Sequence, residues 1–234
     1  MLFRARTLAP LAAACGARLS LSATLPAALG FLLQWRSSFD DARGLGALCR
    51  RWGLQVSETT VELGIRDDID ELLALYETVQ QAVAGTDNDP LWKVGVHPCR
   101  AQLEAAAAGE TLFVLRKDGR IAGAMVADES ITPGYEAVPW NVQAAPGEFA
   151  TVHLFAIHPD FRGQGLARPF LQAVERAARE RGYKAVRLDT LVTNLGAQRT
   201  YERLGYANMG RHHLTYGTYI DTDEPRFVLF EKAL

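Results

Sequence analysis

The sequence predicts one mixed α/β domain, and three observations predict it. Alternating residues at 59–66 are followed by helical periodicity at 67–83. Two apolar runs then surround the turn sequence Lys-Asp-Gly-Arg at 117–120. Finally, an apolar run at 149–157 leads into a long helical segment that reaches about residue 181. Helices between strands, together with a hairpin, favour a mixed sheet over an all-α or all-β fold.

The composition is that of an ordinary globular domain. Of the 234 residues 48% are hydrophobic, and the formal net charge is -2, which excludes a basic nucleic-acid-binding protein. Cys15, Cys49 and Cys99 lie far apart and show neither CxxC nor Cys/His spacing. We therefore expect no disulfide framework, no metal site and a reducing, cytoplasmic location.

Residues 1–57 differ from the rest of the chain. No acidic residue occurs before Asp40, and the most apolar piece, 19–35, is interrupted by Pro26 and is shorter than the roughly 20 residues that span a bilayer. We expect a poorly ordered extension without a membrane span, and residues 58–234 as the domain. A targeting or membrane-surface segment is the alternative.

The first elements are a strand at 59–66, a helix at 67–83 and a second, alanine-rich helix that begins at about residue 96 and ends near Gly109. Asp67 and Asp68 suit the start of the first helix. Its predicted apolar face consists of Ile69, Leu72, Leu73, Tyr76 and Val79.

After the hairpin at 111–129, a proline-containing loop covers 130–148. The helix that follows the strand at 149–157 is predicted to bury Leu166, Phe170, Leu171 and Val174. The remaining predicted elements are a strand at 184–190, a helix at 194–203 and terminal strands at 212–216 and 226–234.

The stretch Arg162-Gly163-Gln164-Gly165 joins the strand at 149–157 to this helix. The first amides of a helix have no partner within it, glycines let an anion approach the backbone, and Arg162 adds a positive charge. The pattern indicates a phosphate site. Glycines that only form a turn are the alternative.

Residues Arg162 to Ala167 fit the pattern Q/R-x-x-G-x-G/A, and the chain here resembles the GNAT superfamily of acyl-CoA-dependent N-acyltransferases. The stretch "TNLGAQRTYERLGY" resembles a second motif of that superfamily, formed by Asn194, Ala197, Tyr201, Gly205 and Tyr206. The resemblance covers residues 59–234. It implies a mostly antiparallel sheet flanked by helices and splayed at its central strands.

The resemblance also implies acetyl-CoA, or another acyl-CoA, as co-substrate. Main-chain groups of Phe155, Ala156 and Ile157 would pair with the pantetheine arm, Asn194 would reach it, and Ala197 would leave it room. The pyrophosphate would be held by Arg162, Gly163, Gln164, Gly165, Leu166 and Ala167. Pro169 departs from a regular helix start because it lacks an amide proton.

Tyr201 resembles the general acid of the superfamily, with a packed core tyrosine as the alternative. Alternation places Thr151, His153 and Phe155 on one strand face, so His153 is a candidate general base. Glu62 and Glu148 are other candidates, and an unassisted amine also remains open.

The acceptor pocket is expected at the loops 90–98 and 134–140. Trp92, Tyr135 and Trp140 would form an aromatic wall, with Thr151 nearby. A cationic amine would be attracted by Glu129, Glu136 or Glu148. Alternatively, the aromatic residues only anchor these loops.

The predicted function is transfer of an acetyl or other small acyl group to a primary amine of a small molecule or protein, by a monomer or homodimer. A non-catalytic acyl-CoA-binding module that senses or regulates is the alternative.

Overall fold

The computed structural model of the protein describes residues 58–216 and 226–234. The prediction for residues 1–57 lies outside this part. The chain divides into two compact units, Met1–Thr60 with Lys117–Arg120, and Val61–Arg116 with Ile121–Leu234. In the smaller unit, the Glu58 amide donates to the Asp118 carboxylate and the Asp118 amide to the Glu58 carbonyl, both at 2.9 Å. The site described below belongs to the larger unit.

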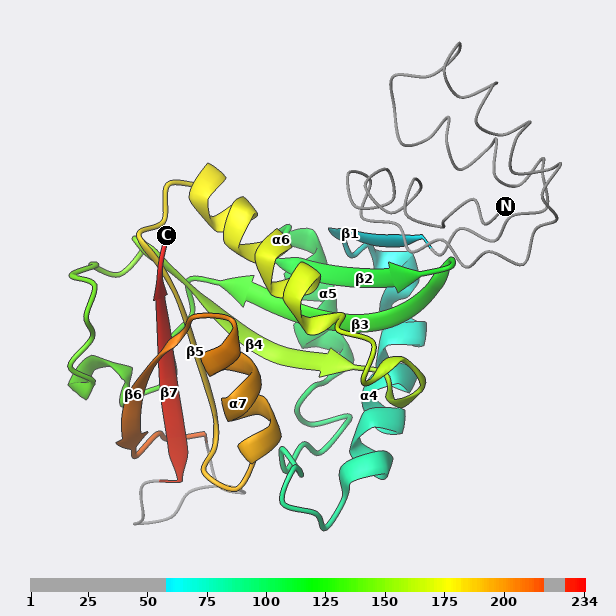
Figure 1. Cartoon of the computed structure of the whole chain (residues 1–234). Helices are drawn as coiled ribbons and strands as arrows, with labels where there is room; N and C mark the ends of the chain where they lie inside the picture. The colour runs from blue at the N-terminus through cyan, green and yellow to red at the C-terminus, as the bar shows by residue number, and fades with distance from the viewer. Residues whose placement is uncertain (1–57, 217–225) are drawn as a thin grey trace, which may run out of the picture. The chain divides into compact units, whose positions relative to one another are not determined.

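Seven strands form one sheet in the described part of the chain, in the order β1-β2-β3-β4-β5-β7-β6 (Figure 1). β4 pairs antiparallel with β3 and parallel with β5, and β7 pairs antiparallel with both β5 and β6. The strands are β1 (Thr59–Leu63), β2 (Leu112–Lys117), β3 (Arg120–Asp128), β4 (Phe149–Ile157), β5 (Ala185–Leu191), β6 (Ala207–His212) and β7 (Phe227–Ala233). The helices are η2 (Arg66–Asp68), α4 (Ile69–Val83), α5 (Arg100–Ala108), η3 (Tyr135–Ala137), η4 (Pro159–Phe161), α6 (Ala167–Glu180) and α7 (Leu195–Arg203).

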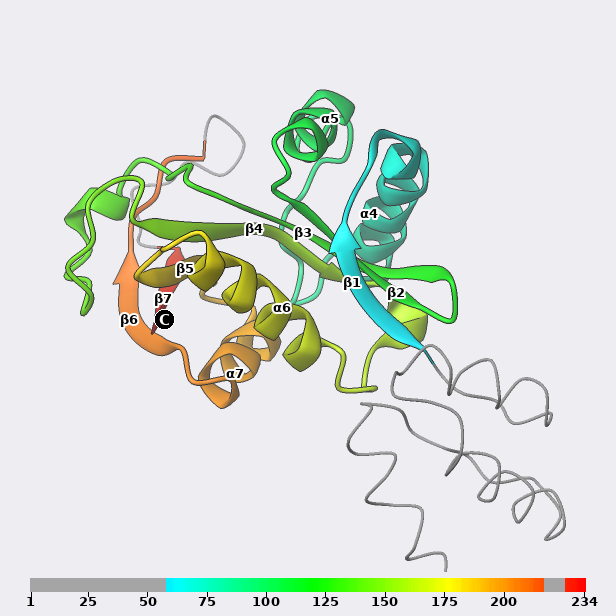
Figure 2. The same ribbon diagram turned by 90° about the horizontal axis from the view of Figure 1, so that it is seen from above.

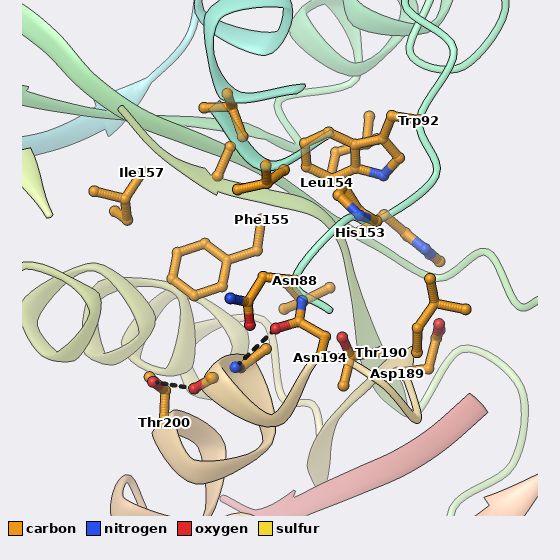
Figure 3. A pocket seen from close by; sticks show the side chains of 18 of the residues that line it. Asn88, Trp92, His153, Leu154, Phe155, Ile157, Asp189, Thr190, Asn194 and Thr200 are labelled. Carbon is orange, nitrogen blue, oxygen red and sulfur yellow. Dashed lines mark hydrogen bonds between the residues drawn. The ribbon is translucent and has the colours of Figure 1, made fainter. Parts of the chain in front are cut away.

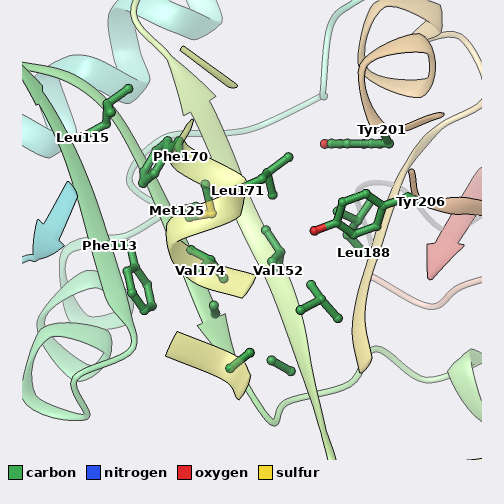
Figure 4. Close-up of a cluster of buried hydrophobic side chains, with 14 of the residues drawn as sticks. Phe113, Leu115, Met125, Val152, Phe170, Leu171, Val174, Leu188, Tyr201 and Tyr206 are labelled. Atoms are coloured by element: carbon green, nitrogen blue, oxygen red, sulfur yellow. The ribbon is translucent and has the colours of Figure 1, made fainter. Parts of the chain in front are cut away.

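Helices cover both faces of the sheet. α4 and α5 lie on one face, and α6 and α7 on the other (Figure 2). The core between α6 and the sheet contains Phe113, Met125, Val152, Phe170, Leu171, Val174 and Leu188 (Figure 4). The four residues predicted to anchor the helix after Gly165 are all buried, which confirms that prediction. On the opposite face, Ile69, Leu72, Tyr76 and Val79 of α4 are buried as predicted, and Leu73 is half-buried.

β4 and β5 diverge part-way along their length. Their pairing ends at Val152 and Leu188, although β4 continues to Ile157 and β5 to Leu191. Between β3 and β4, Val126 pairs with His153 and Ala124 with Ala156, so β4 has one extra residue, and Leu154 has φ 55°. Such a β-bulge bends the strand that contains it. The predicted splay of the central strands is confirmed.

The same bulge corrects the prediction that Thr151, His153 and Phe155 share a face. Phe155 packs with the α6-side core, whereas Leu154 and Ala156 belong to the α4-side core. His153 lies on the α4 side, because its partner Val126 belongs to that core. The extra residue reverses the alternation after Leu154, so Phe155 faces away from His153.

One terminal strand is also displaced from its predicted range of 212–216. β6 instead covers Ala207–His212, with a register irregularity beside Gly210, whose φ is 89°. The Thr215 amide donates to the Pro133 carbonyl at 3.0 Å, so this segment pairs with the long loop after β3.

The tight turn between β2 and β3 is as predicted, since Asp118 and Gly119 have φ of 51° and 79°.

Candidate functional site

A cavity of about 420 Å³ opens where β4 and β5 diverge (Figure 3). Its lining includes the second half of β4, the end of β5, the start of α7 and the loop after α4. Ten of the predicted site residues line it: Trp92, His153, Phe155, Ala156, Ile157, Arg162, Ala167, Asn194, Ala197 and Tyr201. The divergence of the strands therefore brings together residues that are distant in the sequence.

Asp189 lies where the two strands separate, and the sequence analysis missed it. It follows Leu188, the last β5 residue paired with β4, as His153 follows Val152. The carboxylate accepts hydrogen bonds from the Tyr135 hydroxyl at 2.7 Å and the Tyr216 hydroxyl at 2.9 and 3.0 Å. Burial raises the pKa of Asp189, opposed by these hydrogen bonds and by the charge of His153. An acidic residue within a mostly apolar strand is the sequence signal that could have identified Asp189.

His153 and His97 both line the cavity, and their charges interact. The His153 Nε2 is 3.2 Å from both the hydroxyl and the carbonyl oxygen of Ser130, and 3.6 Å from the Asp128 carboxylate. Burial lowers the pKa of His97, although its contact with Gln102 acts in the opposite direction. The neutral form of His97 is therefore favoured near pH 7, and His153 keeps polar partners that can orient its ring.

Tyr201 approaches the cavity from α7. Its ring lies 5.4 Å from Phe230, 6.2 Å from Tyr206 and 6.3 Å from Phe155, measured between centroids. Burial, and then the charge of Asp189, raises the pKa of the Tyr201 phenol. Tyr201 is thus a packed core residue and a cavity residue at once, and its phenol stays protonated at neutral pH.

Tyr76 of α4 supports the bulge from outside the cavity. Its hydroxyl donates to the Leu154 carbonyl at 2.9 Å, at the residue with positive φ. Trp92 packs edge-on against the Tyr76 ring at 5.3 Å. A buried carbonyl that leaves the regular ladder needs a donor, and Tyr76 supplies it.

The glycine loop lies between Arg162 and Ala167, which both line the cavity. Gly163 and Gly165 each have φ 74°, and a Cβ built on either would have no atom within 4 Å. The Arg162 Nε donates to the Ile157 carbonyl at 3.3 Å, and burial lowers the pKa of Arg162. Open backbone beside a cation at the start of α6 fits an anion such as a pyrophosphate. Pro169 lies in the first turn, where an amide needs no partner within the helix.

Asn194 caps α7, since its Oδ1 accepts the Ala197 amide at 3.1 Å. The loop after α4 approaches this helix start closely, because a Cβ on Gly196 would lie 3.1 Å from the Asn88 Oδ1. Asn88 and Asn194 both line the cavity (Figure 3).

Tyr135, Trp140 and Thr151 are not among the residues that line the cavity. Tyr135 and Trp140 form a separate core cluster, and Trp140 stacks on the Arg187 guanidinium at 4.3 Å. Thr151 is fully buried, and its hydroxyl has no partner in the described part of the chain. Tyr135 still reaches the site indirectly through its hydrogen bond to Asp189.

The carboxylates considered from the sequence lie elsewhere. Glu62 pairs with Arg116, Glu148 with Lys184, Glu129 accepts the Tyr183 hydroxyl, and Glu136 accepts the Gly134 amide. None of them lines the cavity. Residues 58–216 and 226–234 contain no group of three potential metal ligands and no helix that is long and apolar enough to cross a membrane.

Comparison with protein families decides the relationship that the motifs suggested. The model of the Acetyltransferase (GNAT) family matches residues 70–206, more than half of the chain. The chain belongs to the GNAT family. The matched range contains the cavity residues of β4, the glycine loop and α7.

The chain is also similar in sequence to individual curated relatives and in fold to solved structures. N-alpha-acetyltransferase 30 of Schizosaccharomyces pombe is 35% identical over 80 residues, which are 34% of this chain and 51% of the relative. A GNAT acetyltransferase structure from Streptococcus agalactiae has a TM-score of 0.63 at 23% identity and covers 75% of this chain and 95% of its own. The structure of yncA from Salmonella typhimurium, solved with acetyl-CoA, has a TM-score of 0.52 at 16% identity and covers 75% and 93%. The match spans 40% to 67% of the length of the curated relatives.

Proposed function

We propose that the protein transfers an acetyl or other small acyl group from acyl-CoA to a primary amine. The main support is the fork between β4 and β5, where His153, Asp189 and Tyr201 line one cavity that extends to Arg162. Most of the curated relatives are named as N-acetyltransferases, and one is named as an N-alpha-acetyltransferase, so an α-amine is among the acceptors to test.

Acyl-CoA would lie along the unpaired half of β4. After Val152, β4 has no strand partner on its β5 side, so main-chain groups from Phe155 to Ile157 are available to a pantetheine amide. Backbone amides of the glycine loop, with Arg162, would hold the pyrophosphate. Ala197, with its small side chain, would leave room beside the arm. The bound co-substrate would supply an activated acyl thioester.

The reaction needs one group that removes a proton and another that donates one. The amine nitrogen forms a bond to the thioester carbonyl carbon as the carbon–sulfur bond breaks. His153 accepts the proton that the ammonium loses, directly or through water. Tyr201, on the α6 side of the sheet, donates a proton to the departing sulfur. The second proton that the nitrogen loses as the amide forms returns through water to the Tyr201 phenolate and restores the phenol. Because burial keeps this phenol protonated, Tyr201 remains a donor across the neutral range.

The test compares Tyr201→Phe with the wild type in an assay of CoA thiol release, driven by a panel of amines. Loss of a general acid should lower kcat about 100-fold while leaving binding of desulfo-CoA unchanged. Tyr183→Phe, on the half-buried tyrosine that donates to Glu129 outside the cavity, is the matched control and should retain full activity. Unchanged kcat in Tyr201→Phe would remove the general-acid role.

A non-catalytic acyl-CoA-binding module remains the second candidate, because a fold and a bound cofactor do not imply turnover. Wild-type protein that is stabilised by acetyl-CoA yet releases no thiol with any amine would favour that module over an enzyme.

A further inference from the structure

Asp189 places a carboxylate at the cavity, where two tyrosine hydroxyls and His153 interact with it. The groups that interact with it are Tyr135, Tyr216 and His153, and no lysine or arginine of the described residues pairs with it. Both tyrosine hydroxyls donate to its oxygens, which is the arrangement that an ionised carboxylate requires. A half-buried carboxylate without a lysine or arginine partner is costly, so a cationic ligand at this point would be favoured.

The surroundings of Asp189 are aromatic and aliphatic. The Tyr216 ring, whose hydroxyl contacts the carboxylate, lies 4.9 Å from the Phe227 ring, and both residues line the cavity. Trp92 and Leu191 also line it. Asp189 is the one acidic residue among the described residues that line the cavity. The cationic residue of the lining, Arg162, contacts Ile157 at the opposite end of the part of β4 that is not paired with β5.

We propose that Asp189 binds the ammonium group of the acceptor, and that the acceptor is an amine with a single positive charge one or two carbons from an aromatic or branched aliphatic group. This inference rests on the proposed function, since it assigns the acceptor of that reaction. One carboxylate balances one ammonium, and the rings of Tyr216 and Phe227 accommodate the apolar carbons next to it. A polycation would leave its further charges against apolar walls.

A panel of amines tests the acceptor class by thiol release. The probes are 2-phenylethylamine, a tetrapeptide with an N-terminal leucine, spermidine, and an N-acetylated peptide with one internal lysine. The first two probes each have one ammonium next to an apolar group, as proposed. Comparing them distinguishes a small-molecule acceptor from a peptide N-terminus. We expect kcat/KM for at least one of them to exceed that for spermidine and the lysine peptide about 10-fold or more. Preference for spermidine or the lysine peptide would overturn the proposal.

Binding that needs no turnover tests Asp189 itself. In the presence of desulfo-CoA, Asp189→Asn should weaken 2-phenylethylamine about 10- to 100-fold, the usual effect of losing a charge-assisted hydrogen bond. It should leave the affinity for the neutral analogue 2-phenylethanol and for desulfo-CoA unchanged. The exposed Asp67→Asn is the matched control. Equal weakening of the amine and the alcohol would reduce Asp189 to a structural residue and overturn the assignment.

The two proposals fail in different ways. Amine binding that depends on Asp189, without thiol release, would contradict the enzyme function and support the acceptor site. Thiol release with spermidine as the best acceptor would support the enzyme function and contradict the acceptor class.

Discussion

The two halves of β4 behave as different structures, although nine consecutive residues form one strand. Phe149–Val152 pairs with β5 and lies within the sheet, whereas Leu154–Ile157 has a strand neighbour only on the β3 side. The bulge at Leu154 divides the two halves. The first half stabilises the fold, and the second half lines the cavity. The site therefore lies where β4 and β5 are no longer joined by hydrogen bonds.

The largest loss of stability is expected from a larger side chain at Gly123, which packs against the second half of β4. A Cβ at Gly123 would lie 2.6 Å from the Ala156 carbonyl oxygen and 2.9 Å from the Ile157 Cδ1. Gly123→Val should therefore lower the free energy of unfolding by about 3 kcal/mol, as overpacking does when backbone must move. Urea denaturation measures it. Gly109→Ala, where the nearest atom is 3.3 Å away, is the control, and an equal loss in both variants would contradict this explanation.

A smaller effect is expected when the bulge loses its donor. Tyr76→Phe removes the hydroxyl that bonds the Leu154 carbonyl and leaves the carbonyl buried without a partner. The free energy of unfolding should fall by about 1–2 kcal/mol. If the bulge positions the second half of β4, the affinity for desulfo-CoA should fall as well. Loss of stability with unchanged affinity would separate the bulge from the cofactor site.

Asp189→Asn should stabilise the fold at neutral pH. The pKa of Asp189 is raised in the folded protein, so the stabilisation from its bound proton is complete below the ordinary aspartate pKa of about 3.9 and is lost as the pH rises through the raised value. At pH 7 the asparagine avoids this burial cost, and a gain of about 1 kcal/mol is the usual scale of such a substitution.

Urea denaturation at pH 7 and at pH 3.5 measures this difference. The gain should shrink at the lower pH, and a gain that is equal at both pH values would contradict a cost due to the charge.

The smallest effect on activity is expected from a substitution at Glu148, the residue just before β4. Glu148 is half-buried, and its contact with Lys184 lowers the pKa of its carboxyl. Because Glu148 is outside the cavity, Glu148→Gln should leave kcat/KM and its pH dependence unchanged. Loss of the acidic limb of the pH profile would restore Glu148 as a candidate base, because a general base must be deprotonated to act.

Local patterns were sufficient to predict most elements, but not the division of β4. The turn at Asp118-Gly119 and the buried face of α6 depend on residues close in sequence, and both are as predicted. The bulge depends on how β3 and β5 pair with β4, and Leu154 has no glycine or proline beside it that would indicate positive φ. For the same reason the sequence misplaced Phe155 relative to His153. Asp189 was missed because its partners, Tyr135 and Tyr216, are 54 and 27 residues away.

The position of β7 also determines the order in which the sheet can be completed during synthesis. β7 lies between β5 and β6, yet a ribosome makes residues 227–233 after both of these strands. Until then β6 lacks the strand it pairs with, and buried Arg187 lacks Glu231, which it contacts at 3.0 Å. Until β7 is made, the emerging chain thus exposes an unpaired strand edge at β5. Such edges promote aggregation of nascent proteins and are bound by chaperones.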